Sequence, residues 1–254
     1  MRRRFLLIDV SNTFTKVALA TDRGVGRVEK IPTCEVTSAQ VLDVAAGKRL
    51  DLVILCSVVP TVTRRLMKGI PGRVLLVGAE QCGGLAVDYP SPNSIGADRL
   101  ANALACVELY GAPSIVVDFG TAVTFDVISA EGAYVGGVIA PGLNLMAEYL
   151  HSRTALLPLL KLRRPMGVVG KSTEEAMLSG AVHGYRGLVT GILDRITEEC
   201  FGGKRPVVVA TGGDAGLIGE SLPIFDGIDP TLTLRGLHLV AMRSEKAGEV
   251  QNTP

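Results

Sequence analysis

Residues 115–126 read IVVDFGTAVTFD, an apolar strand that runs directly into an acid, a glycine and a group of hydroxyls and backbone amides. Residues 5–19, FLLIDVSNTFTKVAL, repeat this arrangement near the N-terminus. Sliding the two stretches together pairs Asp9 with Asp118, Ser11 with Gly120, Asn12 with Thr121 and Thr15 with Thr124. We interpret them as two copies of one phosphate-binding hairpin.

The chemistry of such a hairpin explains why it would be used twice. A buried strand carries the acid at its end, and the turn that follows presents N–H groups and hydroxyls to an anion. Because a carboxylate repels a phosphate, Asp9 and Asp118 imply metal ions that bridge the protein and a polyphosphate. An ordinary turn aspartate would explain either copy alone. The matching pattern of the two copies favours phosphate binding.

The composition is that of an α/β protein with many tight turns, since 47% of the 254 residues are apolar and 30 are glycine. The 26 Lys and Arg residues nearly balance the 25 Asp and Glu residues, and no basic stretch alternates with aromatic side chains. We therefore expect no nucleic-acid partner. No uninterrupted apolar run approaches membrane-spanning length, so we expect no membrane partner either.

The cysteines and the N-terminus both indicate a cytoplasmic location. The five cysteines show no CxxC spacing, which is typical of reduced thiols in a protein without a zinc site. Asp9 ends the apolar run that follows the N-terminal arginines, too early for a signal peptide.

The order of the predicted strands indicates two related α/β halves. A three-strand meander over residues 5–31 is followed by helices and strands, and a second meander over 114–139 starts the order again. We predict domains at 1–112 and 113–254. The last helix is expected at 233–243, followed by a frayed tail at 244–254.

A long helix is predicted after Ser172, which has Glu175 three residues on and so matches a capping box. Four glycines share one face of this helix at spacings of four, three and four: Gly180, Gly184, Gly187 and Gly191. Because each lowers helix propensity, we expect another backbone to approach this face, from the same chain or from a dimer partner.

Just before this helix, residues 167–173, GVVGKST, resemble a P-loop without matching it. The motif needs a glycine where Pro165 stands, and no buried strand precedes it.

Asp98 and Arg99, in the motif GADR, lie in the first turn of a predicted helix, where the helix dipole affects both side chains. The helix dipole favours an ionised Asp98, which suits a carboxylate that accepts a proton. The same dipole disfavours Arg99, so an anionic ligand such as a substrate carboxylate better explains it. A solvated surface pair is the plain alternative.

The motifs DVSNTFTK, GADR, DFGTAVTFD, GGVIAPG, GKSTEEAMLSG and ATGGDA occur in this order over nearly the whole chain. Together they resemble the type III pantothenate kinases, within the actin-like ATPase superfamily that includes sugar and acetate kinases. The resemblance implies two ribonuclease-H-like domains with ATP in the cleft between them. It implies ATP-dependent phosphorylation of pantothenate to 4'-phosphopantothenate, the first step of coenzyme A biosynthesis.

The resemblance also implies roles for individual residues. Asp98 would be the general base. The ATP-binding positions would be Asp9, Val10, Ser11, Asn12, Thr13, Phe14, Thr15, Lys16 and Thr121. The pantothenate-binding positions would be Tyr89, Gly96, Ala97, Asp98, Arg99 and Thr173. Asp118 would bind a monovalent cation, K⁺ or NH₄⁺, and Asp9 a divalent cation such as Mg²⁺. A homodimer is implied as well.

One residue departs from the family pattern, because Ser11 stands where the family usually has glycine. If that position needs a positive φ, serine adds strain of about 1 kcal/mol or more. Its hydroxyl could instead donate to a phosphate. Two alternatives therefore stay open from the sequence: a kinase of another small hydroxy acid or sugar, and a catalytically silent paralogue of the same fold.

Overall fold

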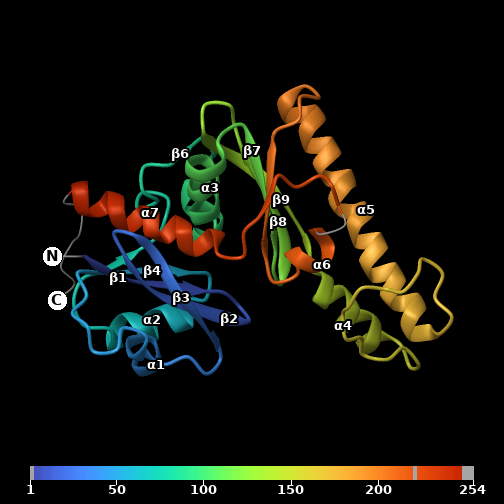
Figure 1. Cartoon of the computed structure of the whole chain (residues 1–254), viewed down its shortest axis with the longest axis horizontal. Helices are drawn as coiled ribbons and strands as arrows, with labels where there is room; N and C mark the ends of the chain where they lie inside the picture. The colour runs from blue at the N-terminus through green and yellow to red at the C-terminus, as the bar shows by residue number, and fades with distance from the viewer. Residues whose placement is uncertain (1–2, 220–221, 248–254) are drawn as a thin grey trace. The chain divides into compact units, whose positions relative to one another are not determined.

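The computed structural model describes residues 3–219 and 222–247 and has an α/β architecture (Figure 1). The chain forms two compact units. Unit 1 holds residues up to Leu109, a short segment at 132–135, and the chain from Thr231 onward. Unit 2 holds 110–131 and 136–230.

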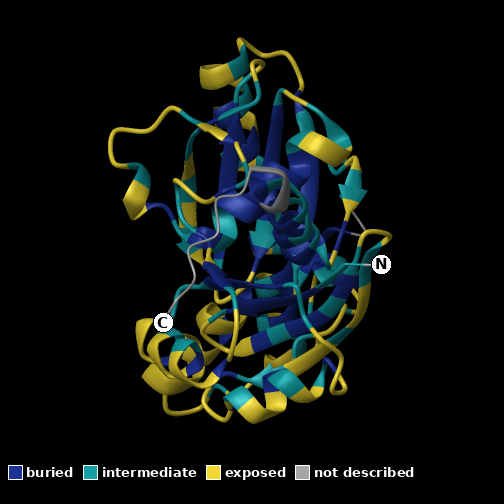
Figure 2. Ribbon diagram, turned by 90° about the vertical axis from the view of Figure 1, so that its left-hand side faces the viewer, coloured by how far each residue is buried: buried dark blue, intermediate teal, exposed yellow. Residues whose placement is uncertain are grey.

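Unit 1 is built on a five-stranded sheet in the order β3-β2-β1-β4-β5. The strands are β1 (Arg4–Val10), β2 (Phe14–Thr21), β3 (Gly24–Pro32), β4 (Leu52–Ser57) and β5 (Val74–Leu76). β1 is antiparallel to β2 and parallel to β4. Residues 5–10 of β1 are all buried, as expected for a central strand covered on both faces. Figure 2 shows such buried strands in dark blue.

Helices cover both faces of the unit 1 sheet (Figure 1). They are α1 (Ser38–Asp43), α2 (Pro60–Gly69) and α7 (Leu232–Ala247). α3 (Ala97–Tyr110) packs against α7, and a 3₁₀ turn lies at Pro92–Ser94. Leu6 and Ile8 share a core with residues of α1 and α2, such as Val41 and Leu66. Because side chains alternate along a strand, Phe5 points to the other face, where its ring meets His238 of α7.

The last helix belongs to unit 1, so the predicted domain of residues 113–254 is wrong at its C-terminal end. α7 packs against β1, β3 and β4, and its residues Leu234, Leu237 and Val240 are fully buried there. The helix also runs to Ala247, so residues 244–247 of the predicted tail are helical. The rest of that tail, 248–254, lies outside the described residues.

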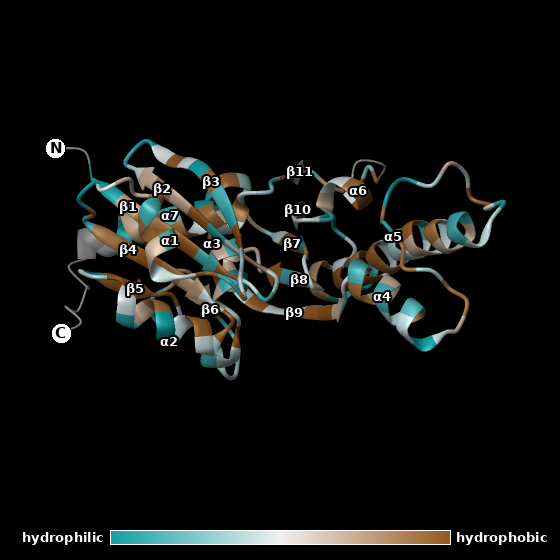
Figure 3. Cartoon of the chain, turned by 90° about the horizontal axis from the view of Figure 1, so that it is seen from below, coloured by the Kyte–Doolittle hydropathy of each residue, from teal (hydrophilic) through white to brown (hydrophobic). Residues whose placement is uncertain are grey.

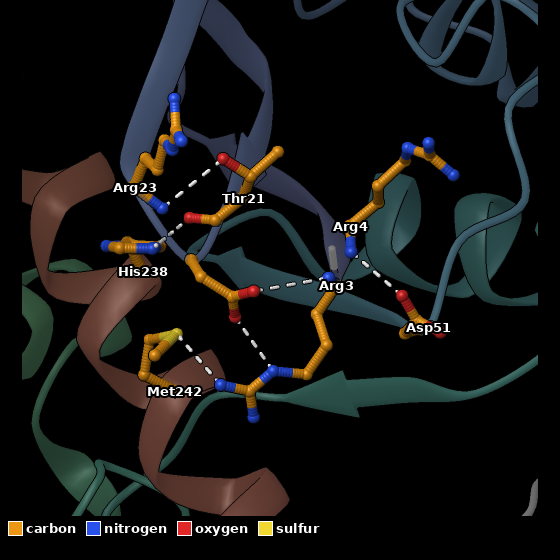
Figure 4. Close-up of polar contacts among 8 residues, drawn as sticks. Arg3, Arg4, Thr21, Arg23, Asp51, His238 and Met242 are labelled. Carbon is orange, nitrogen blue, oxygen red and sulfur yellow. Dashed lines mark hydrogen bonds and ion pairs between the residues drawn. The ribbon is translucent and has the colours of Figure 1, made fainter. Parts of the chain in front are cut away.

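Polar contacts fasten α7 to the first hairpin of unit 1 (Figure 4). His238 Nε2 lies 2.8 Å from the carbonyl oxygen of Thr21 at the end of β2. Arg3 donates to Asp22 at 2.8 Å and to the sulfur of Met242 at 3.9 Å. These contacts join the first strand to the last helix.

In unit 2 the strand order is β11-β10-β7-β8-β9, and β6 continues the sheet beside β9. The strands are β7 (Ser114–Phe119), β8 (Ala122–Ile128), β9 (Ala133–Pro141), β10 (Val207–Gly212) and β11 (Gly227–Ile228), whereas β6 (Ala86–Val87) belongs to unit 1. β6 and β11 are two-residue strands that the sequence pattern does not predict. β9 begins in unit 1, where Ala133 and Tyr134 pair with β6, and continues in unit 2.

The helices of unit 2 are α4 (Leu143–Arg153), α5 (Thr173–Phe201) and α6 (Ala215–Gly219). Ser172 caps α5 as predicted, accepting from the N–H of Glu175 at 3.2 Å, while the Glu175 carboxylate pairs with Arg163. Apolar bands mark α4 and α5 in Figure 3.

The glycine face of α5 does not meet another backbone of this chain. Gly180, Gly184, Gly187 and Gly191 are exposed, and a methyl group added at any of them meets no described atom within 4 Å. The expectation of a packing partner within the chain is therefore wrong for the described residues.

Gly236 supports a first testable prediction, because α7 crosses α3 there at backbone contact. A Cβ at Gly236 would overlap the carbonyl group of Ala101. We expect Gly236→Ala to destabilise the protein by about 1–3 kcal/mol, since the helices must separate to admit the methyl group. Urea unfolding of the full chain measures this. Gly213→Ala, which adds a methyl where nothing lies within 4 Å, is the control, and equal stability of the two variants would contradict the crossing.

Candidate active site

The first hairpin brings the carboxylate of Asp9 and the ammonium of Lys16 together at the end of a buried strand. Asp9 is 2% exposed and stands opposite Lys16 in the β1–β2 register, with Lys16 Nζ 3.7 Å from Asp9 Oδ2. The turn that follows Val10 exposes Asn12, Thr13 and Phe14. This loop therefore presents three exposed residues beside a paired carboxylate.

Ser11 fits this turn without backbone strain. The only described non-glycine residue with a positive φ is Ala46, so Ser11 does not adopt the left-handed conformation. Its N–H donates to the carbonyl of Phe14 at 3.2 Å, and its hydroxyl lies 3.5 Å from Asp9 Oδ1. Ser11 therefore has none of the backbone strain considered from the sequence, and backbone strain is no reason to expect a catalytically silent paralogue.

The second hairpin has a shorter turn than the first. Three residues separate the paired Phe119 and Val123, whereas four separate Val10 and Thr15. Thr124 therefore stands opposite Asp118 as Lys16 stands opposite Asp9. When the two hairpins are aligned, Thr124 therefore corresponds to Lys16 and not to Thr15 as predicted. The sequence alone does not reveal the extra turn residue in the first hairpin.

Asp118 lies close to Gly212 and Thr211 of β10 within unit 2. It is half-buried at the end of β7, and a Cβ at Gly212 would stand 2.6 Å from its Oδ1 atom. The neighbouring Thr211 is buried, and its hydroxyl has no hydrogen-bond partner among the described residues. Thr121 is exposed in the turn. Glycine at position 212 therefore lets β10 approach the Asp118 carboxylate closely.

Asp98 sits at the N-terminus of α3, where its Oδ1 atom accepts the N–H of Arg99 at 2.9 Å. Burial raises the pKa of the Asp98 carboxyl above its usual value, and the Arg99 hydrogen bond and the charges of Arg99 and Lys16 oppose that rise. Burial likewise raises the pKa of the Cys56 thiol, and the charges of Asp9 and Asp98 add to it. Asp9, Lys16 and Asp98 therefore share one electrostatic environment within unit 1.

Aromatic rings surround the predicted substrate residues. The Arg99 guanidinium lies 5.7 Å from the ring centroid of Tyr134, and Tyr89 meets the same ring edge-on at 6.2 Å. A Cβ at Gly96 would stand 2.6 Å from Asp98 Oδ1, so a larger residue there would displace the carboxylate. Ala97 is buried beneath them.

Tyr134 is the residue that the sequence analysis missed. It is 1% exposed and lies on β9, whose pairing with β6 brings it to the substrate residues. No local motif marks it, because β6 is too short for a periodic signal.

The predicted site residues divide between the units. Unit 1 holds Asp9 to Lys16, Tyr89 and Gly96 to Arg99, and these are the residues that the structure brings together. Unit 2 holds Asp118, Thr121 and Thr173, and Thr173 is exposed at the first position of α5. No group of three His, Cys, Asp or Glu side chains in residues 3–219 and 222–247 is arranged to hold a metal ion by itself.

Two further observations concern the helices and the cysteines. No helix among the described residues has the length and apolar character needed to cross a membrane. All five cysteines lie in the described part of the chain as free thiols.

Comparison with solved structures identifies the fold. The fold resembles component A of (R)-2-hydroxyglutaryl-CoA dehydratase from Acidaminococcus fermentans, with a TM-score of 0.57 at 16% identity, over 97% of this chain and 100% of that one. It also resembles an archaeal actin homologue, with a TM-score of 0.56 at 10% identity, over 95% of this chain and 100% of that one. The chain therefore has the actin-like ATPase fold, as the motifs predicted.

Sequence comparison is more specific. The family model for type III pantothenate kinase matches residues 5–195. The chain is 49% identical to a type III pantothenate kinase of Akkermansia muciniphila over 93% of this chain and 98% of that one. It is 45% identical to one of Methylacidiphilum infernorum over 92% and 87%, respectively. The chain belongs to the type III pantothenate kinase family, so the activity predicted from the motifs, ATP-dependent phosphorylation of pantothenate in coenzyme A biosynthesis, is confirmed.

The conformation of Ser11 supports a second prediction. Because Ser11 has no left-handed φ, Ser11→Gly gains nothing in the folded state and makes the unfolded chain more flexible. We expect it to lower the free energy of unfolding by about 0.4–1 kcal/mol. Denaturant titration of both proteins measures this. A variant more stable than the parent would show that serine is strained in this turn.

Proposed function

We propose that Asp98 is the general base that removes the proton from the primary hydroxyl of pantothenate. The observation that carries this proposal is the environment of its carboxylate: half-buried, raised in pKa by burial, and held at a helix N-terminus by the N–H of Arg99. A raised pKa makes a carboxylate a better proton acceptor near neutral pH. The hydroxyl oxygen then attacks the γ-phosphorus of ATP, and ADP leaves.

Arg99 is proposed to bind the carboxylate of pantothenate. Its guanidinium is held over the ring of Tyr134, which fixes the direction of its hydrogen-bond donors. Tyr89, Gly96 and Ala97 form the rest of this pocket in our proposal, because they adjoin Arg99 or Tyr134. Thr173 is proposed as a further pantothenate-binding residue from the family resemblance.

The two hairpin turns are proposed to bind the phosphates of ATP. Residues 9–16 supply the exposed amides of the first turn, with the Lys16 ammonium beside Asp9. Thr121 supplies a hydroxyl from the second turn. Backbone N–H groups and a lysine ammonium are common phosphate ligands.

Asp118 is proposed to hold K⁺ or NH₄⁺, and Asp9 to contribute to a Mg²⁺ site. The Asp118 carboxylate and the buried, unpartnered hydroxyl of the neighbouring Thr211 supply oxygen atoms of the kind that bind such a cation. Asp9 is a single carboxylate, which suits a Mg²⁺ ion that takes most of its ligands from ATP and water. Such cations neutralise charge on the transferred phosphoryl group. Release of ADP measured with K⁺ and with Na⁺ tests the monovalent site.

We further propose a cytoplasmic homodimer. The exposed glycine face of α5 and the exposed apolar residues Leu145 and Tyr149 of α4 are the surfaces that suit self-association. Five free thiols suit a reducing compartment. Sedimentation of the full chain tests the dimer, and a monomer at micromolar concentration would contradict it.

Replacing the base tests the proposed role of Asp98. We expect Asp98→Asn to lower kcat about 100-fold or more while the Kd for ATP stays within about twofold, because only proton acceptance is lost. Coupled ADP release and calorimetry measure the two quantities. Asp43→Asn, at an exposed site on α1, is the control. A wild-type kcat for Asp98→Asn would overturn the assignment.

The pH dependence gives a further test. A base must be ionised, so kcat/KM for pantothenate should fall as pH decreases through the raised pKa of Asp98. The positive charge of Lys16 lowers that pKa, so Lys16→Met should move the acidic limb of the profile to higher pH. Lys48→Met, at an exposed position, should leave the limb in place. A shift of the limb to lower pH in Lys16→Met would exclude Asp98 as its origin.

A further inference from the structure

Thr33 contacts the first hairpin turn at three points. It follows Pro32, the last residue of β3, and is 3% exposed. Its N–H donates to the carbonyl of Thr13 at 3.0 Å, and its hydroxyl donates to the carbonyl of Ser11 at 2.7 Å. The hydroxyls of Thr33 and Thr15 lie 3.1 Å apart in the same buried site.

The donors and acceptors of this cluster can be assigned. A threonine hydroxyl carries one proton, and that of Thr33 is given to Ser11. The Thr15 hydroxyl must therefore donate to Thr33 Oγ1. Removing the Thr33 hydroxyl would take a partner from Thr15 and from the Ser11 carbonyl at once, in a place that water does not reach.

These bonds set the direction of the loop amides. In a planar trans peptide the C=O of one residue and the N–H of the next point in opposite directions. Because the carbonyls of Ser11 and Thr13 point at buried Thr33, the N–H groups of Asn12 and Phe14 point the other way. Asn12, Thr13 and Phe14 are exposed, so that direction is the open side of the loop.

Unit 2 contains a matching contact. Gly142 follows Pro141, the last residue of β9, and its N–H donates to the carbonyl of Thr121 at 3.0 Å. A Cβ at Gly142 would overlap the carbonyl oxygens of Thr121 and Gly120, although its φ of −68° would suit any residue. In both units, the residue after the proline that ends the third meander strand therefore holds a carbonyl of the hairpin turn.

We propose that Thr33 and Gly142 are positioning residues for ATP: each turns loop carbonyls inward so that the adjoining N–H groups face the phosphates. The proposal rests on the proposed function of the two turns as phosphate-binding loops. Thr33 uses its backbone and its hydroxyl, whereas Gly142 uses its backbone and the absence of a side chain. An inverted peptide in either loop would place a carbonyl oxygen against a phosphate, which repels it.

The test compares two substitutions of Thr33. Thr33→Val keeps the branched shape and removes the hydroxyl, and Thr33→Ser keeps the hydroxyl. We expect Thr33→Val to raise KM and Kd for ATP about 5- to 30-fold with KM for pantothenate unchanged, and Thr33→Ser to stay within about threefold of the parent. Thr233→Val removes another buried hydroxyl, bonded to Asn102 at 2.8 Å, and controls for loss of stability alone.

Gly142→Ala extends the test to unit 2, where a displaced Thr121 carbonyl should raise KM for ATP at least fivefold. It also keeps the proposal testable if Thr33→Val does not fold. Lys16→Ala separates the two levels of the argument. Unchanged ATP affinity in Thr33→Val or in Gly142→Ala, with weakened affinity in Lys16→Ala, would overturn the positioning role alone. Unchanged affinity in Lys16→Ala as well would overturn the phosphate-binding loops themselves.

Discussion

In the function proposed for the two hairpin turns, phosphate binding depends on the orientation of a few peptide groups. A loop binds phosphate only if its N–H groups face the ligand and its carbonyls face elsewhere, and the carbonyls then need buried donors. The β1–β2 turn obtains these donors from Thr33, and the β7–β8 turn obtains one from Gly142. In each meander, the residue that follows the third strand therefore holds the turn between the first and second strands.

The fold of unit 1 also determines the surroundings of the carboxylates of Asp9 and Asp98. β1 is buried along its length, so Asp9 at its end is desolvated and needs the Lys16 ammonium. Burial raises the pKa of Asp98, whereas the hydrogen bond from the Arg99 N–H and the charges of Arg99 and Lys16 limit the rise. An ion pair at Asp9 and a backbone hydrogen bond at Asp98 therefore give these two carboxylates of unit 1 different surroundings.

Much of this could be predicted from sequence, because the decisive signals are local. The buried strand before Asp118, the helix start at Asp98 and the cap at Ser172 each depend on neighbouring residues, and each element lies where it was expected. Contacts between distant segments could not be predicted. Tyr134 joins the substrate residues through a two-residue strand, α7 returns to unit 1, and one added turn residue shifts Thr15 against Thr124. None of these leaves a periodic trace in the chain.

The return of α7 has a consequence for synthesis on the ribosome. Unit 1 begins with β1 but lacks the helix that covers Phe5 and the rest of that sheet face until residues 232–247 have been made, whereas every residue of unit 2 has already been translated by Thr231. The half that starts first is therefore completed last, and it contains Asp98. A chain released before α7 is made would expose this apolar sheet face, so the protein depends on α7 to keep that face covered.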